Sequence, residues 1–383
     1  MRIAIVGCGF VSDHYLMTHT NHPILELTGV MDLQQERAAR VASHYSVTHY
    51  RSLDELLADD SVDTVLNLTN PRAHFEVSKA CLERGKHVYS EKPLTMRFDE
   101  AKQLVNMAEE RGLHISGAPC NLLGESAQSF WKALRDNEIG NPVLAYVELD
   151  CGMVHRSRYR HWKNKFGVPW PWKDEFEVGI TLEHAAYYVS LLTAFFGPAK
   201  TVTAFSSCLI PDKGTDEPLE VDGDDFSTAC IRFESGVVAR LTNSGVAKRR
   251  HELVVHGEGG ILSSSDVWYY NAPVYIERPT RLPMRLDQYP VVKKLLGVGP
   301  RKYPLVKKSR FRHFHVGNQM DFCRGVAEMA EAIAEQRPSR LSTEYVLHVT
   351  EVVAAIEDPE GMGTPRTIET SFSPIDPMPW AKP

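Results

Sequence analysis

Short apolar runs alternate with amphipathic stretches through the first third of the chain. The run from Ile3 to Val6 is continuously apolar, which is typical of a strand buried on both faces of a parallel sheet. Similar runs occupy residues 25–31, 64–68, 87–90 and 114–117, and helical stretches occupy 54–58, 73–84 and 98–111. Strands that alternate with helices of this length predict a doubly wound parallel sheet with right-handed crossovers.

The pattern changes in the second part of the chain, where strands dominate. They are predicted over residues 143–149, 201–206, 226–233, 237–243 and 251–256, with a glycine-rich turn at 257–260. This pattern favours an α+β domain with a large, mostly antiparallel open sheet. We therefore expect an α/β domain over residues 1–120 and an α+β substrate-binding and oligomerisation domain over 121–383.

The composition narrows the class of protein. The chain is 43% hydrophobic and 24% charged, and its net charge of −6 argues against a dedicated nucleic-acid binder. Its seven cysteines lack CxxC or Cys/His spacing, which indicates free thiols in a reducing compartment and no metal site. The apolar run at the N-terminus is too short for a signal peptide or a membrane span. A cytoplasmic protein with no membrane or nucleic-acid partner is expected.

A glycine-rich turn follows the first strand. Gly7 and Gly9 match the G-x-G-x-x-G/A pattern, in which the first two glycines permit a tight turn and close approach of a pyrophosphate, whereas the third position holds Ser12, a small residue that departs from the pattern. Asp32 ends the second strand, at the spacing where a carboxylate meets the adenosine ribose and repels a 2′-phosphate. We therefore predict a Rossmann domain that binds NAD in preference to NADP. The turn residues expected to contact the coenzyme are Gly7, Gly9, Phe10 and Val11.

Ligands of such sheets bind at the carboxyl ends of the strands, and further segments with candidate chemistry lie there. The glycine turn, Thr69-Asn70-Pro71 with His74, and Glu91-Lys92-Pro93 after Gly85-Lys86-His87-Val88 together resemble the Gfo/Idh/MocA oxidoreductases. Glu-Lys-Pro is the most specific of these matches. The resemblance extends over nearly the whole chain through Glu138-Ile139-Gly140 with Pro142, Gly197-Pro198, and a late helix over 320–336 followed by Arg337-Pro338.

The resemblance implies an NAD(P)-dependent oxidoreductase that interconverts a secondary alcohol and a ketone on a sugar, cyclitol or sugar nucleotide. Lys92 would lie near the nicotinamide and transfer a proton, and a lysine removed from water has a lowered pKa that suits this role. The resemblance assigns further residues to the coenzyme site: Thr69, Asn70, His74, Glu91, Lys92, Pro93 and Asn121. Asn121 is what remains here of an Asn-Arg-Arg segment found in many family members.

A second family pattern, G-G-x-x-x-D-x-G-x-H, matches residues 178–187 with two departures. Glu183 replaces the aspartate and Tyr187 replaces the histidine, and the two would share one helix face. A phenol is normally a proton donor, and a nearby Lys92 ammonium would lower its pKa. Some sugar ketoreductases of the family carry tyrosine here, so we expect Tyr187 to be the acid/base, Glu183 to orient it or bind a substrate hydroxyl, and reduction to be favoured. His184 is the alternative base.

Two unusual segments remain. Residues 155–174 mix cations with tryptophans, and Trp162 and Trp172 are expected to contact the substrate together with Lys92 and Glu183; a protein–protein contact is the alternative. Segment 278–312 contains eleven Lys or Arg residues and one acid, Asp287. We expect it to form either a solvated insertion or arm that reaches over a partner subunit, or a contact with the phosphates of a nucleotide-linked sugar.

Alternatives to a dehydrogenase or reductase stay open from the sequence. The altered second pattern also fits an NAD(H)-binding regulator without turnover, or an enzyme that keeps NAD tightly bound for redox-neutral sugar chemistry. The resemblance further implies a homodimer or homotetramer that assembles through the exposed face of the C-terminal sheet.

Overall fold

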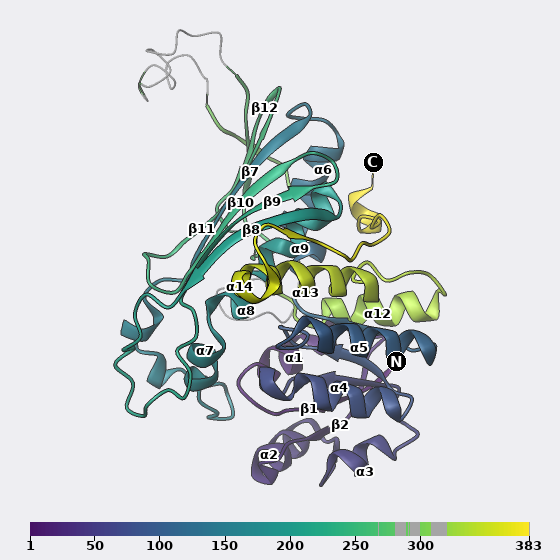
Figure 1. Ribbon diagram of the computed structural model, residues 1–383. Coiled ribbons are helices and arrows are strands. Elements are labelled where there is room, and N and C mark those ends of the chain that lie inside the picture. Colours follow the sequence, from purple (N-terminus) through teal and green to yellow (C-terminus); the bar gives the residue numbers. More distant parts are fainter. Residues whose placement is uncertain (267, 280–288, 290, 292–298, 308–319, 383) are drawn as a thin grey trace.

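Two sheets organise the chain, and Figure 1 shows them as separate layers with helices packed around them. The structure is a computed structural model that describes residues 1–266, 268–279, 289, 291, 299–307 and 320–382. Most of the basic segment 278–312 lies outside the described residues, so both interpretations of it remain predictions.

The N-terminal sheet is parallel, and within the described residues it has six strands in the order β3-β2-β1-β4-β5-β6. Its strands are β1 (Arg2–Val6), β2 (Glu26–Met31), β3 (Thr48–His49), β4 (Thr64–Asn67), β5 (His87–Ser90) and β6 (Ile115–Gly117). The strand order reverses between β1 and β4. At the end of β1, Val6 pairs with Met31 of β2 on one side and with Asn67 of β4 on the other. Ligands of open α/β sheets bind at this reversal.

Helices cover both faces of this sheet because successive side chains of β1 point to opposite faces. Ile3 and Ile5 pack in a core with residues of α1, α2 and α12, whereas Ala4 and Val6 pack in a core with residues of α3, α4 and α5. The helix from the C-terminal part of the chain, α12, thus completes the N-terminal core. These helices are α1 (Ser12–Thr18), α2 (Gln35–Tyr45), α3 (Leu53–Leu57), α4 (His74–Glu83), α5 (Phe98–Glu110) and α12 (Arg324–Ala334).

The second sheet, as far as the structure describes it, has nine strands in the order β14-β13-β12-β11-β7-β10-β9-β8-β15. It is antiparallel except for the β7–β10 pair. The strands are β7 (Pro142–Asp150), β8 (Ala199–Ser207), β9 (Phe226–Phe233), β10 (Val238–Ser244), β11 (Arg250–Gly257), β12 (Gly260–Ser264), β13 (Val274–Glu277), β14 (Arg301–Tyr303) and β15 (Arg366–Thr367).

Helices pack on one face of the second sheet and between the two sheets (Figure 1). They are α6 (Glu125–Arg135), α7 (Trp172–Val178), α8 (Ile180–His184), α9 (Ala186–Phe196), α13 (Thr343–Glu357) and α14 (Pro359–Met362). Short 3-10 turns occupy His19–Asn21, Pro71–Ala73, Asn121–Leu123, Val154–Arg156, Tyr159–His161 and Pro379–Ala381. None of the helices in the described part of the chain is long and apolar enough to cross a membrane.

The predicted fold class is confirmed, and the predicted strands differ from the observed ones by two residues or fewer at each end. The stretch that matches the second family pattern was expected to be one helix, but it is divided among α7, α8 and α9. Gly179 has φ +89° and separates α7 from α8, and Ala185 lies between α8 and α9 with helical backbone angles. A Cβ at Gly179 would lie 2.9 Å from the backbone of Asp224, so this turn requires glycine.

Candidate active site

A cleft of about 1020 Å³ lies at the strand ends of both sheets. Segments that follow these strands and the loop between β7 and α7 line it. Twelve of the residues predicted for the site line this cleft within the described part of the chain. They are Gly9, Phe10, Val11, Thr69, Asn70, Glu91, Lys92, Trp162, Trp172, Glu183, His184 and Tyr187. The other five predicted residues lie behind the lining and support it. They are Gly7, Asp32, His74, Pro93 and Asn121.

The glycine turn has the geometry of a phosphate cradle. Gly7 has φ +99°, and a Cβ there would lie 2.5 Å from the Leu68 carbonyl oxygen at the end of β4. At Gly9, by contrast, a Cβ would have nothing within 4 Å, so the main chain is open to the cleft. Ser12 is fully buried, and its hydroxyl donates to the Gly9 carbonyl at 2.8 Å, which explains a polar residue at the third position. The turn therefore fits a dinucleotide pyrophosphate.

Asp32 is directed at the turn. Its carboxylate accepts hydrogen bonds from the backbone N–H groups of Cys8 and Gln34, each at 2.7 Å. Gln34 and Arg37 line the cleft beside it. Contact of Asp32 with a ribose stays a prediction, and the same edge of the cleft also presents the Arg37 cation.

His74 connects two loops of the site from behind. The buried imidazole lies 2.6 Å from the Pro93 carbonyl oxygen through Nδ1 and 2.9 Å from the Thr69 carbonyl oxygen through Nε2. Burial lowers the pKa of His74 despite these two acceptors. His74 and Pro93 therefore fix the ends of β4 and β5 relative to each other, and Asn70 adds a hydrogen bond to Asp174 on α7 at 2.7 Å.

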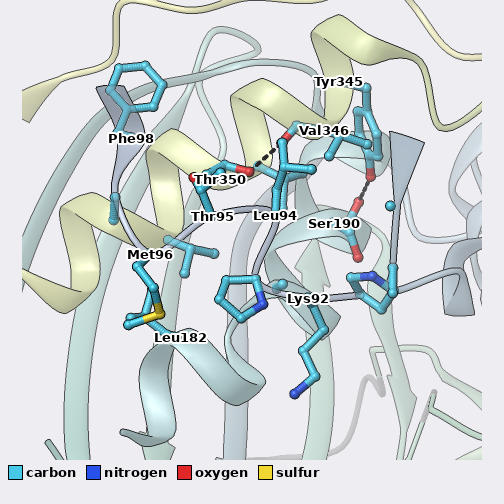
Figure 2. A pocket seen from close by; sticks show the side chains of 18 of the residues that line it. Lys92, Leu94, Thr95, Met96, Phe98, Leu182, Ser190, Tyr345, Val346 and Thr350 are labelled. Carbon is cyan, nitrogen blue, oxygen red and sulfur yellow. Dashed lines mark hydrogen bonds between the residues drawn. The ribbon is translucent and has the colours of Figure 1, made fainter. Parts of the chain in front are cut away.

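Lys92 extends into the cleft from a rigid loop. Glu91 is buried and accepts from the Tyr15 hydroxyl at 2.8 Å and from the Lys92 N–H at 2.9 Å. Behind the loop, Leu94 and Tyr345 line a small cavity of about 30 Å³ near α13 (Figure 2). Figure 2 shows the Lys92 amino group pointing away from those residues. Its Nζ instead forms an ion pair with the Glu183 carboxylate, and both side chains are largely buried.

The ion pair reverses the expected titration of Lys92. Burial by itself lowers the pKa of Lys92, but the negative charges around it, first that of Glu183 and then that of Glu175, raise the pKa above its usual value overall. The prediction of a lowered lysine pKa is therefore wrong, because a carboxylate meets the ammonium inside the site. Lys92 is therefore an ammonium at neutral pH.

Tyr187 packs against an aromatic residue, Trp268, that no sequence motif marks. Its ring centroid lies 4.3 Å from that of Trp268, which also lines the cleft. Burial raises the pKa of Tyr187 more than the Lys92 ammonium lowers it, so the expected lowering is also wrong. Asn121 is buried and donates to the Tyr187 carbonyl oxygen at 3.0 Å, so it holds the start of α9 rather than lining the cleft.

His184 is a weak base in this setting. Burial lowers its pKa well below the usual value, and the charges of Lys92 and His251 lower it further. Its ring stacks on Trp268 at 5.7 Å between centroids, and Nδ1 is buried with no hydrogen-bond partner in the described part of the chain. The imidazole is therefore neutral at physiological pH.

Glu175 joins the site without having been predicted. It lies on α7, lines the cleft, and is in hydrogen-bonding contact with Glu183. Burial, followed by the neighbouring Glu183 charge, raises the pKa of Glu175 to about 8. A carboxylate eight positions before Glu183 carries no motif, and only the Gly179 turn brings the two together.

The aromatic loop between β7 and α7 reaches the nucleotide turn. Asn164 donates through Nδ2 to the Gly9 carbonyl at 3.1 Å, and the Lys165 N–H donates to Asp13 at 3.2 Å. Trp162 and Trp172 line the cleft, although Trp172 also packs against Tyr159 at 6.0 Å between centroids. The loop thus contacts the glycine turn and α1 and also contributes to the lining of the cleft.

Comparison with known families identifies the chain. A family model described as "Oxidoreductase family, NAD-binding Rossmann fold" matches residues 1–117, and that of the GFO/IDH/MocA C-terminal domain matches residues 128–263. The chain belongs to the Gfo/Idh/MocA oxidoreductase family. Like its relatives, which are named as dehydrogenases, the chain is an NAD(P)-dependent oxidoreductase that acts on CH–OH groups.

Three known proteins illustrate the range of this family. The 4-carboxy-2-hydroxymuconate-6-semialdehyde dehydrogenase of Sphingobium sp. strain SYK-6 is 27% identical over 245 residues, which cover 64% of this chain and 72% of that protein. The structure of UDP-N-acetylglucosamine 3-dehydrogenase from Acidithiobacillus ferrooxidans matches with a TM-score of 0.68 at 21% identity, covering 93% of this chain and 96% of the other. A 3-ketoreductase from Actinomadura kijaniata in complex with NADP matches with a TM-score of 0.68 at 20% identity and the same coverage. The two structural matches show the fold.

Proposed function

We propose that this oxidoreductase reduces a ketone to a secondary alcohol on a sugar, cyclitol or sugar nucleotide, with the reverse oxidation at higher pH. The observation that supports it best is the meeting of Lys92, Glu183 and Tyr187 in the cleft that also contains the glycine turn. The names of relatives that act on UDP-N-acetylglucosamine or as a 3-ketoreductase point to the same substrate class. The proposal keeps residues 1–120 as the coenzyme domain and 121–383 as the substrate domain.

The proposed chemistry divides between the coenzyme and the side chains. A bound nicotinamide dinucleotide supplies or accepts the hydride. The Lys92 ammonium protonates the substrate oxygen and stabilises the negative charge that develops there. Glu183 holds that ammonium in position, and the Tyr187 hydroxyl is a second donor to the substrate. Both donors are protonated at neutral pH, which favours reduction.

The decisive experiment is a titration of the purified protein with NADH and NADPH followed by fluorescence, and then a screen of keto-sugars. We expect coenzyme binding and turnover of at least one ketone. No binding of either coenzyme, with none already bound after purification, would contradict the proposal.

For the coenzyme we propose a preference for NAD, because a carboxylate at the end of β2, as Asp32 provides, would repel a 2′-phosphate. The Arg37 guanidinium, which lines the same edge of the cleft, works against that preference. The ratio of the NADH and NADPH dissociation constants from the same titration tests this directly.

A second candidate function is redox-neutral sugar chemistry with a coenzyme that stays bound. The observation that favours it is the contact of Asn164 and Lys165 with the nucleotide turn and α1, which covers the coenzyme groove. Near-ultraviolet absorbance of freshly purified protein, before and after gel filtration, distinguishes the two. A retained coenzyme that Asn164→Ala releases would favour the second candidate.

We further propose a homodimer or homotetramer that assembles through the second sheet, in the cytoplasm. The strand register places Tyr146 and Phe205 on the same outer face of the sheet. Tyr146 pairs with Arg240, which pairs with Cys230. In the neighbouring row, Thr242 pairs with Thr228, which pairs with Phe205. Tyr146 is 36% exposed and Phe205 is 56% exposed. Light scattering of the protein and of a Phe205→Glu variant tests this assembly, which the variant should weaken.

A further inference from the structure

The proton supply of the cleft is the feature that the proposed function leaves unexplained. Lys92 gives up a proton when it protonates the substrate oxygen, and an amine left beside Glu183 must regain one before the next turnover. The pKa of Lys92 is raised and that of His184 is lowered, so neither group exchanges protons readily near neutral pH. A group beside this pair whose pKa lies nearer to neutral would supply that proton.

Glu175 is placed to hold it. The Gly179 turn folds α7 against α8 so that the Glu175 carboxyl group contacts Glu183, whose other partner is the Lys92 amino group. The three side chains form a continuous chain at the cleft wall. Two adjacent carboxyl groups in a buried site share a proton, because both cannot readily be charged there. The Lys92 charge compensates one negative charge, and the proton compensates the other.

The groups that face this carboxyl group come from several elements. They are Glu183 on α8, Tyr187 on α9, Glu91 and Lys92 after β5, and Cys151 after β7. Burial, with the Glu183 charge, raises the pKa of Glu175 to about 8, while Lys92 lowers it. Burial raises the pKa of Cys151 to about 12, so its thiol stays protonated and does not compete.

We propose that Glu175 is the proton reserve of the site and recharges Lys92 through Glu183. This inference rests on the proposed function. In this proposal Glu175 acts through Glu183 and Lys92 rather than on the substrate, so it is a positioning residue rather than a catalytic one.

The step balances as follows. The ketone carbon accepts a hydride from a reduced nicotinamide dinucleotide, an N–H bond of Lys92 breaks, and its proton forms the O–H bond of the product alcohol. Glu183 passes a proton to the Lys92 amine while the O–H proton of Glu175 passes to Glu183. Lys92 is then an ammonium again, both carboxyl groups are ionised, and a proton from water restores Glu175. Oxidation of an alcohol runs through the same groups in reverse and needs Glu175 ionised.

The test compares the wild-type protein with Glu175→Gln, which keeps the shape but cannot titrate. We expect the wild-type rate of ketone reduction to fall as pH rises through about 8, where Glu175 loses its proton. In Glu175→Gln that step disappears, and kcat at neutral pH falls about 10- to 100-fold, with KM and coenzyme affinity little changed. Glu175→Asp, which restores a titratable acid, should recover part of the rate and the pH step.

A readout without turnover separates this inference from the proposed function. Infrared spectroscopy of the coenzyme-free protein should show a protonated carboxyl C=O band that vanishes as pH rises through about 8 and is absent in Glu175→Gln. Glu177→Gln is the matched control on the same helix, since Glu177 is buried but pairs with Arg72 instead. A band that persists in Glu175→Gln, or an unchanged pH profile, would overturn the inference. Turnover that is absent with every ketone would instead overturn the proposed function, while the band would still decide where the proton resides.

Discussion

The two sides of the cleft are built from different parts of the chain. The nucleotide side is formed mainly by main chain: Gly7 and Gly9 shape the turn, and His74 joins the neighbouring loops through two carbonyl groups. The substrate side is formed by charged side chains, with Lys92 and Glu183 in contact inside a largely buried wall. The first side depends on space and backbone angles, and the second depends on a balance of charge in a poorly hydrated region.

This difference predicts different responses to mutation. A change on the nucleotide side should act through volume and leave the pH dependence alone. A change on the substrate side should act through protonation, because interactions between charges are strong where water is excluded. Five variants test this contrast.

Lys92→Ala should have the largest effect, because it removes both the proton donor and the positive charge beside the substrate oxygen. We expect kcat to fall about 1000-fold or more, with the dissociation constant of the coenzyme changed only slightly. Steady-state kinetics and a fluorescence titration measure the two quantities. Lys102→Ala is the control, since Lys102 is exposed and pairs with Glu369 far from the cleft. Near-normal turnover in Lys92→Ala would remove the assigned role.

Gly9→Val should abolish most coenzyme binding without destabilising the fold. A Cβ there would meet nothing in the protein within 4 Å, so we expect the valine to occupy the open space above the turn. We expect coenzyme affinity to fall about 100-fold and the unfolding temperature to stay unchanged.

Gly7→Ala is the matching variant, because we expect it to reduce the stability of the fold, whereas Gly9→Val reduces coenzyme affinity. Its φ of +99° and the 2.5 Å approach to Leu68 should destabilise the protein by about 2 kcal/mol. If Gly9→Val bound the coenzyme normally, the turn would not be the phosphate cradle.

The same difference between the two sides explains what the sequence could predict. The parallel sheet, the second sheet and the nucleotide turn follow from apolar periodicity and glycine spacing, which are local properties. Lys92 and Glu183 were found through motifs, but the raised pKa of Lys92 was not, because it depends on the contact of Lys92 with Glu183. Glu175 and Trp268 carry no local signal. The Gly179 turn brings Glu175 to the cleft, and the end of the second sheet brings Trp268 there. Both placements are specified only by the tertiary structure.

Tyr187→Phe should have an intermediate effect. It removes one donor while the ring keeps its contact with Trp268, so we expect kcat to fall about 10- to 100-fold with unchanged stability. Tyr188→Phe is the adjacent control, since that hydroxyl is buried without a hydrogen-bond partner in the described residues and lies outside the cleft lining. Equal losses in the two variants would show that Tyr187 supports packing rather than chemistry.

Arg37→Ala should have the smallest effect, and it tests whether the nucleotide side also uses charge. Arg37 is half-buried at the edge of the cleft next to Gln34, and a partly solvated cation there would attract a 2′-phosphate only modestly. We expect NADPH to bind about fivefold more weakly, close to 1 kcal/mol, and NADH to bind as before. Arg51→Ala, an exposed arginine outside the cleft lining, is the control. A loss that is equal for both coenzymes would mean that Arg37 supports the turn, and the nucleotide side would then depend on main-chain shape together with Asp32 alone.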